Sequence, residues 1–208
     1  ATTGAEGGAF DTFRYDPANP VPTRGGPVCC TGNAGDRPGP ADQADVEARD
    51  DVLVYTSAPL PADLRIAGPL RARLTVSSSA PDTDLVLRLV HVWPNGRATN
   101  IQEGALRLRY RDGFAQPRLM EPGRRYEATV DMRSIAYLLP QGHRLRLHVT
   151  SSSFPRLERN LNTGAPNNAE ESRIEVATTR PETMPLRLPS ILSTRGTLPL
   201  GQRLSLLL

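Results

Sequence analysis

The stretch from Leu70 to Trp93 constrains the fold of this chain more than any other segment. Over residues 70–77, apolar residues alternate strictly with arginine, threonine and serine. A period of two sends one set of side chains into a core and the other toward water, as in a half-buried β-strand. Residues 85–93 are largely apolar on both faces, which is typical of a strand in the middle of a sandwich. The Pro-Asn-Gly-Arg sequence at 94–97 then predicts a tight hairpin turn.

The rest of the chain repeats this strand pattern. Further strands are predicted over residues 52–56, 105–110, 126–132, 143–150 and 172–177. One short stretch, residues 134–139, has a helical pattern that stops at Pro140. Many short strands with almost no helix predict an all-β fold, an antiparallel β-sandwich. Its predicted core consists of Leu74, Val76, Leu87, Leu89, Leu106, Leu108, Val130, Leu145, Leu147 and Val149.

The chain has 208 residues, which is enough for one domain with a substantial core. We expect an N-terminal segment with a long loop over residues 1–46, the sandwich over 47–180, and a C-terminal segment over 181–208. The loop is rich in proline, glycine and aspartate, and loops of that length are often functional. The first ten residues are typical of a cut end or a loop rather than of a structured start. No signal peptide or apolar run of membrane-spanning length is present, and the compartment stays unassigned.

The charge pattern argues against nucleic-acid binding. The net charge is +3, and all 25 basic residues are arginines that mostly alternate with apolar residues along strands. A phosphate-binding surface would combine clustered basic residues with stacking aromatics, and aromatic residues make up only 5% of the chain. We therefore interpret the arginines as the solvated or interface-facing side of the strands.

No motif in this sequence supplies the nucleophile, base and acid that a serine hydrolase needs. The Gly-x-Ser-x-Gly nucleophile elbow is absent from the sequence. The serine runs at 77–79 and 151–153 lie at strand ends, where hydroxyls more often bond turn backbone. His91 and His148 fall within strand patterns and His143 follows a glycine in a turn, which favours packed or surface histidines. We therefore predict no catalytic residue.

Two further clusters contain residue types that can bind metal ions. Asp82 and Asp84 suggest a calcium loop, but the rest of an oxygen cage is missing. We favour the alternative that Asp82 bonds the turn backbone and Asp84 faces an arginine. Cys29 and Cys30 are adjacent, so a disulfide between them would be strained, and free thiols are the simpler interpretation. With no nearby histidine they fall short of a zinc site, and we predict neither metal nor cofactor.

The loop at 154–164 is the most polar irregular stretch. It has two interpretations: a hydrogen-bonded loop that covers the sandwich, or a surface that docks against a partner domain through arginine and asparagine. The residues of the docking hypothesis are Phe154, Arg156, Arg159, Asn160 and Asn162.

Two long segments carry a family resemblance. Residues 77–98, SSSAPDTDLVLRLVHVWPNGRA, and residues 142–164, GHRLRLHVTSSSFPRLERNLNTG, are similar to the C-terminal domain of the CocE/NonD serine hydrolases. That family includes cocaine esterases and resembles X-prolyl dipeptidyl peptidases. Shorter matches at 13–26, 39–43 and 49–53 occur in the same order. Together these segments cover most of the chain. The family domain would normally include a little more strand upstream, so the resemblance implies that this chain begins inside its domain.

The resemblance implies a jelly-roll sandwich of the galactose-binding-domain type. It also implies that the catalytic triad belongs to a preceding α/β-hydrolase domain, which this domain would buttress while it shapes one wall of the cleft. The full enzyme would then hydrolyse a small ester or amide, or act as an X-Pro dipeptidyl peptidase. By resemblance, Gly25, Gly26, Cys29 and Cys30 lie beside the acyl pocket, where cocaine-esterase-like members carry larger apolar residues at the two cysteine positions. The alternative for this loop is that it merely covers a domain seam.

Two other classes of function remain open. An independent jelly-roll carbohydrate-binding module would present aromatic platforms to sugar rings, and the only tryptophan, Trp93, precedes the hairpin. A self-associating structural protein would show a solution mass above that of one chain.

Overall fold

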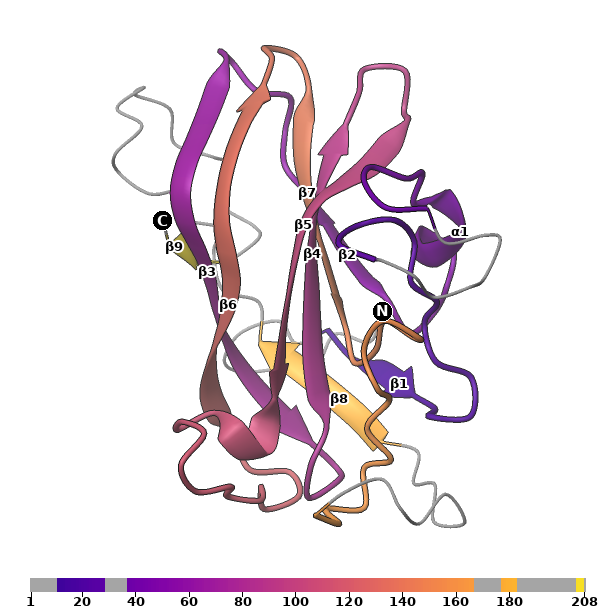
Figure 1. The fold of residues 1–208 in the computed structure, drawn as a ribbon, viewed down its shortest axis with the longest axis vertical. Helices are drawn as coiled ribbons and strands as arrows, with labels where there is room; N and C mark the ends of the chain where they lie inside the picture. The colour runs from indigo at the N-terminus through magenta and orange to yellow at the C-terminus, as the bar shows by residue number, and fades with distance from the viewer. Residues whose placement is uncertain (1–10, 29–36, 167–176, 183–204, 208) are drawn as a thin grey trace.

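The computed structural model describes residues 11–28, 37–166, 177–182 and 205–207 as a sandwich of two antiparallel β-sheets (Figure 1). One sheet has the order β1-β8-β3-β6, with β9 also paired to β3, and the other has the order β2-β7-β4-β5. The elements are β1 (Phe13–Tyr15), α1 (Ala44–Glu47), β2 (Leu53–Thr56), β3 (Leu64–Ser78), β4 (Asp84–Val92), β5 (Ala98–Arg107), the 3₁₀ turn η1 (Leu108–Tyr110), β6 (Tyr126–Leu139), β7 (Arg144–Thr150), β8 (Ala177–Glu182) and β9 (Ser205–Leu207). The predicted all-β antiparallel sandwich is confirmed.

The pairing of the strands identifies the sandwich as a jelly roll. Strand β4 pairs with β5, β3 with β6, β2 with β7 and β1 with β8, all antiparallel. This is a long two-stranded ribbon rolled up so that successive pairs alternate between the two sheets. No part of this order follows from strand patterning alone, since the same strands could form other sandwiches.

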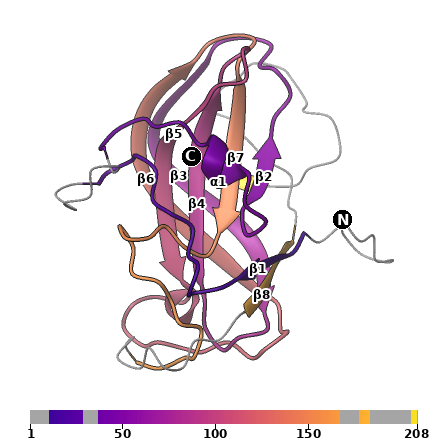
Figure 2. The same cartoon turned by 90° about the vertical axis from the view of Figure 1, so that its right-hand side faces the viewer.

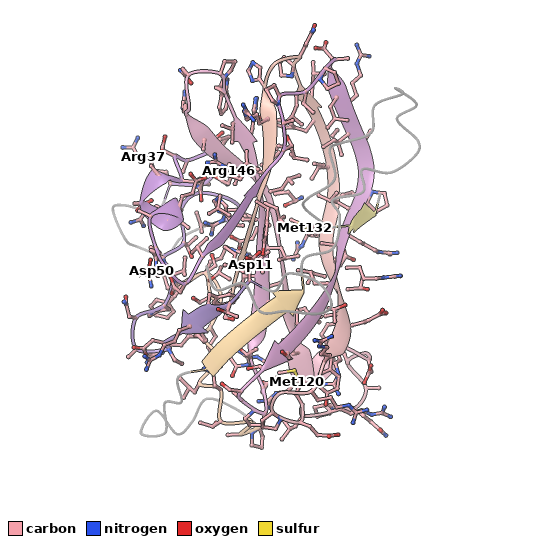
Figure 3. The ribbon with its side chains drawn as sticks, turned by 180° about the vertical axis from the view of Figure 1, so that it is seen from behind. Asp11, Arg37, Asp50, Met120, Met132 and Arg146 are labelled. Atoms are coloured by element: carbon pink, nitrogen blue, oxygen red, sulfur yellow. The ribbon has the colours of Figure 1, made fainter. Side chains whose placement is uncertain are left out.

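The core lies between the sheets and follows the alternation seen in the sequence. Along residues 64–74 of β3, buried positions alternate with exposed ones, except at Gly68, which is only half-buried. Of the predicted core residues, all are buried except Leu106, which is half-buried and packs at the margin. Met132, labelled in Figure 3, is fully buried on β6. Gly104 on β5 lies so close to β6 that a Cβ would come within 2.5 Å of the Asp131 carbonyl oxygen.

The outer face of the β2-β7-β4-β5 sheet is covered by the N-terminal loop and α1 (Figure 2). Every residue of β4 is therefore buried, as expected for its apolar pattern. The loop contributes an apolar cluster of its own, Val21, Val46 and Val52. The N-terminal loop and α1 thus form a partial third layer on this sheet. They place polar loop residues directly over the centre of the sheet.

Two local predictions were wrong. Residues 134–139 are not helical but continue β6, because they pair in register with residues 64–69 of β3. The chain stays extended past Arg133, which adopts a positive φ of 64° close to a register shift in β3. Residues 108–110 are not strand but the 3₁₀ turn, which is closed by the Arg111 amide donating to the Leu108 carbonyl oxygen at 3.2 Å.

The predicted strand at 172–177 lies outside the described residues except for Ala177, the first residue of β8. Among the helices that the structure describes, none is long and apolar enough to cross a membrane.

Candidate functional site

Two loops that the sequence marks separately lie side by side on the outer face of the β2-β7-β4-β5 sheet. Pro22 and Phe154 form an isolated parallel β-bridge. The Thr23 amide donates to the Phe154 carbonyl oxygen at 2.7 Å, and the Phe154 amide donates to the Val21 carbonyl oxygen at 2.9 Å. We call the surface formed by residues 20–26 and 153–159 the joined-loop surface.

The glycine pair in this surface is explained by close packing within the chain. Gly25 and Gly26 have φ values of 63° and 80°, a region that favours glycine. A Cβ on Gly25 would lie 2.3 Å from the Gly39 carbonyl oxygen. Gly26 and Gly39 exchange two backbone hydrogen bonds of 2.7 and 3.0 Å. The pair therefore closes the loop onto itself, whereas Cys29 and Cys30 lie outside the described residues.

A buried charge network anchors the joined-loop surface to the sheet. Arg88, in the middle of β4, is 3% exposed and donates to Glu103 Oε2 through Nε and Nη2 at 2.9 and 2.6 Å. Arg88 Nη1 also donates to Gln43 Oε1 at 2.8 Å. Arg156 pairs with the other oxygen of Glu103. One carboxylate thus lies between two guanidiniums, and burial lowers the pKa of Arg88 to about 10.

The side chains at the rim of this surface are partly open to solvent. Phe154 is 41% exposed, and the Arg159 guanidinium lies 5.9 Å from the centre of its ring. Arg159 Nη1 donates to the Pro17 carbonyl oxygen at 3.1 Å. The Nε of Arg156 is buried and has no hydrogen-bond partner in the described part of the chain. Desolvation, followed by the charge of Arg88, lowers the pKa of Arg156.

The aspartate pair after β3 binds arginine and asparagine side chains. Asp84 accepts from Arg107 Nε at 2.9 Å and Nη2 at 3.1 Å, which confirms the prediction that it faces an arginine. Asp82 accepts from the backbone amide and Nε of Arg109 at 2.9 and 2.8 Å. Asn160 Nδ2 donates to both carboxylates at 2.8 Å. Burial raises the pKa of Asp84, although Arg107 and Asn160 act in the opposite direction.

The two asparagines of the docking hypothesis are internal residues of this domain. Asn160 is 2% exposed and Asn162 is fully buried, and the amide of Asn162 donates to Asn160 Oδ1 at 2.9 Å. The side chain of Asn160 holds the loop in place through these bonds, and neither asparagine side chain is presented at the surface. The docking hypothesis therefore narrows to Phe154, Arg156 and Arg159.

Three serine hydroxyls at the strand ends bind turn backbone, the N-terminal loop or the charge network. Ser78 Oγ accepts from the Ala80 amide at 3.1 Å, and Ser152 Oγ accepts from the Val21 amide at 2.8 Å. Ser153 Oγ lies 3.2 Å from Arg88 Nη2 and 3.2 Å from Thr23 Oγ1, so it belongs to the charge network. The hydroxyls of Ser78 and Ser152 thus accept hydrogen bonds from backbone amides, whereas that of Ser153 contacts side chains.

The histidines are packed against polar partners. His148 is 1% exposed, and its Nε2 lies 2.9 Å from Glu47 Oε1. Burial lowers the pKa of His148, and the nearby Glu47 carboxylate opposes this effect only in part. The pKa of Glu47 is itself lowered, because hydrogen bonds from His148 and Arg146 outweigh its desolvation. His91 lies between Tyr137 Oη at 2.8 Å and His143 Nδ1 at 2.6 Å.

Trp93, the only tryptophan of the chain, is packed against other side chains of the same domain. The His91 ring stacks on it with centroids 3.9 Å apart and an interplanar angle of 14°. The Arg97 guanidinium lies 5.3 Å from its ring centre. An aromatic platform for a sugar needs an open ring face, so this arrangement does not favour the carbohydrate-module alternative.

Comparison with known proteins identifies the family. Residues 5–186 match the family described as the X-Pro dipeptidyl-peptidase C-terminal non-catalytic domain. The chain belongs to this family. This non-catalytic domain is 46% identical over 154 residues to the cocaine esterase of Rhodococcus sp. (strain MB1 Bresler), a match that covers 74% of the chain and 26% of the esterase.

Solved structures agree with this assignment. An α-amino acid ester hydrolase superposes with a TM-score of 0.77 and 30% identity, over 86% of this chain and 31% of that chain. An aminopeptidase from a marine sediment archaeon (Thaumarchaeota archaeon) gives a TM-score of 0.75 and 33% identity, over 85% and 31%. The domain therefore spans between about a quarter and a third of the length of these relatives. The resemblance to the C-terminal domain of CocE/NonD hydrolases is confirmed.

The charge network is the part of the site that the sequence interpretation missed. The sequence does contain an indication of this network, because Arg88 is the one charged residue in the otherwise apolar run 85–90. A charge in a strand with two buried faces requires a partner. Glu103 lies directly opposite it on β5, but nothing in the sequence gives the register of that pair.

Proposed function

We propose that this chain is the non-catalytic β-sandwich domain of a CocE/NonD-type serine hydrolase that cleaves small esters, amides or X-Pro peptides. In that enzyme it buttresses an α/β-hydrolase domain and shapes one wall of the substrate cleft. Family membership and the share of the relatives that the chain spans support this proposal. The observation that carries it is the joined-loop surface, where two loops are anchored rigidly over the sheet and expose an aromatic side chain.

The chemistry of the joined-loop surface fits a partner domain. Phe154 offers an apolar contact, and arginines flank it on a short, hydrogen-bonded loop. Two guanidiniums share the single carboxylate of Glu103, which leaves positive charge at the rim. A buried donor without an acceptor costs free energy, so an acceptor supplied to Arg156 Nε by the catalytic domain would stabilise the contact.

The proposed contact between the joined-loop surface and the catalytic domain is tested with Phe154→Ala, in the full-length enzyme and in the isolated domain. We expect the substitution to leave the melting temperature of the isolated domain nearly unchanged, because Phe154 is partly exposed there. In the full-length enzyme it should lower the melting temperature and the thermal half-life of activity. Phe114→Ala is the matched control, since Phe114 is 82% exposed on a loop outside the joined-loop surface. Equal effects of the two substitutions in the full-length enzyme would argue against the proposed contact.

The catalytic partner itself is tested at the gene. The reading frame that encodes Ala1 should carry, upstream, a Gly-x-Ser-x-Gly elbow within an α/β-hydrolase sequence. A frame that starts at this domain, or that encodes an unrelated upstream domain, would contradict the proposed function.

The loop from Pro20 to Gly39 is proposed to line the acyl pocket of that enzyme. By family resemblance, Gly25, Gly26, Cys29 and Cys30 form the pocket wall, and small thiols would leave more room than the larger apolar residues of cocaine-esterase-like members. Cys29→Phe and Cys30→Phe should shift the ratio of kcat/KM between bulky and small acyl substrates. Reactivity of the nucleophile with a small acylating probe serves as the control. An unchanged ratio in both variants would remove these cysteines from the pocket wall.

A further inference from the structure

A second site lies at the end of the sandwich, between the end of β2, the β4–β5 hairpin and the start of β7. It is a groove of about 580 Å³, lined by Thr56, Pro59, Val92, Trp93, Arg144 and Arg146 among others. The hairpin lies above helix α1 in the view of Figure 1, and Arg146 is labelled in Figure 3. A volume of this size accommodates a small organic molecule.

The groove carries positive charge. Arg144 and Arg146 are two residues apart on β7, so their side chains leave the strand on the same face. None of the described residues that line the groove is acidic. Glu47, on α1, accepts from Arg146 Nη1 at 2.5 Å and so balances one of the two charges from outside the lining.

Hydrogen bonds within the chain hold the guanidiniums of Arg144 and Arg146 in place. These bonds use only some of the N–H donors of each group. Arg144 Nη1 donates to the Ser57 carbonyl oxygen at 3.0 Å. Arg146 Nε donates to Thr56 Oγ1 at 2.8 Å. A guanidinium has five N–H donors in a planar fork that matches a carboxylate. Since Arg146 already pairs with Glu47, Arg144 is the arginine whose charge has no carboxylate partner among these contacts.

Apart from Thr56, the remaining lining has no polar side chain. Pro59, Pro94 and Trp93, whose ring is held by stacking on His91, line the groove beside the arginines. A ligand that fits both the arginines and the apolar lining has an anionic head and a compact apolar body. We propose that the groove binds a small organic carboxylate, with its carboxylate on Arg144 and its apolar body against Trp93. This inference does not depend on the proposed function, because it concerns a site formed by this domain alone.

The test uses the full 208-residue chain with phenylacetate as the probe. Because Trp93 is the only tryptophan, its fluorescence reports on the groove directly, and calorimetry measures the affinity independently of that reporter. We expect a saturable signal with phenylacetate. The neutral isostere phenylacetamide should bind about 10-fold more weakly or worse, because it cannot form the charge-assisted pair. Inorganic phosphate should bind weakly, because it has no apolar body.

Arg144→Gln is the decisive variant, and we expect it to weaken phenylacetate binding about 10-fold or more by calorimetry. Arg97→Gln is its matched control: it removes the same charge near the same tryptophan, but Arg97 is exposed and does not line the groove. Arg97→Gln should bind phenylacetate within about twofold of the unchanged chain, since it removes no direct contact. Arg144→Lys, which keeps the charge and loses the fork, should fall between the two, and thermal unfolding verifies that each variant is folded.

Three results would overturn the proposal. The first is the absence of saturable binding of phenylacetate to the unchanged chain. The second is equal affinity for phenylacetate and phenylacetamide, or for phenylacetate and phosphate, because the site would then not recognise an organic carboxylate. The third is an equal loss of affinity in Arg144→Gln and Arg97→Gln, which would reduce the effect to general electrostatics. Success or failure here leaves the domain-contact experiment with Phe154→Ala unaffected.

Discussion

Leu147 belongs to the hydrophobic core between the two sheets. It lies on β7, is 2% exposed, and pairs in register with Leu89 of β4. We expect Leu147→Ala to lower the free energy of unfolding by about 2 to 5 kcal/mol, through lost burial and the cavity left behind. Leu138→Ala is the control, because Leu138 is 47% exposed on β6 and should cost about 0.5 kcal/mol or less. Urea unfolding of both variants measures the difference, and equal losses would contradict the assigned core.

His148 couples the stability of the domain to pH. Its pKa is lowered by burial in the folded state, whereas the unfolded value is about 6.5. Above the unfolded pKa neither state binds the proton. As the pH falls below about 6.5 the unfolded state binds it first, so the free energy of unfolding decreases toward the folded pKa. Urea unfolding at several pH values between 7.5 and 5 should show this loss.

His148→Gln should make that pH dependence shallower without removing it. The pKa of His91 is also lowered by burial, followed by the charge of His143, and it contributes with the same sign. An identical pH dependence in His148→Gln and the unchanged chain would contradict the role assigned to His148.

At the scale of the elements, β4 and β5 are joined by a buried ion pair as well as by their hydrogen-bond ladder. Glu103→Gln would leave the buried Arg88 and the half-buried Arg156 without a carboxylate between them. We expect a loss of about 3 to 5 kcal/mol in the free energy of unfolding, because a buried charge would lose its partner. Glu121→Gln breaks the exposed pair with Arg124 and should cost about 1 kcal/mol or less. Comparable melting temperatures for the two variants would argue against the network.

At the scale of the whole molecule, the prediction concerns activity. The hydroxyls of Ser78 and Ser152 bind backbone amides, that of Ser153 belongs to the charge network, and the sequence contains no nucleophile elbow. We expect the isolated chain to show no turnover of p-nitrophenyl acetate that depends on a single serine. The measurement compares the rate of the unchanged chain with buffer and with serine-to-alanine variants. Turnover abolished by one such substitution would show that this domain is itself catalytic.

The sequence by itself determined the strands whose two faces differ. In β3, leucine, alanine and valine alternate with arginine and threonine, so only one orientation of the strand buries its apolar side chains. Strand β4 was predictable for the opposite reason, since a run apolar on both faces must be covered on both. The arginine partner of Asp84 was expected as well, although only the structure identifies it as Arg107.

Tertiary structure decided what depends on pairing between distant segments. Residues 134–139 carry a weak local preference for helix, yet the hydrogen bonds offered by residues 64–69 of β3 hold them as strand. The jelly-roll order, the register that sets Glu103 opposite Arg88, and the contact of Pro22 with Phe154 likewise join residues far apart in the chain. Local patterning specifies which face of a strand is buried. The choice of neighbour depends on how all the strands pack at once, and for that reason the candidate site emerged only from the fold.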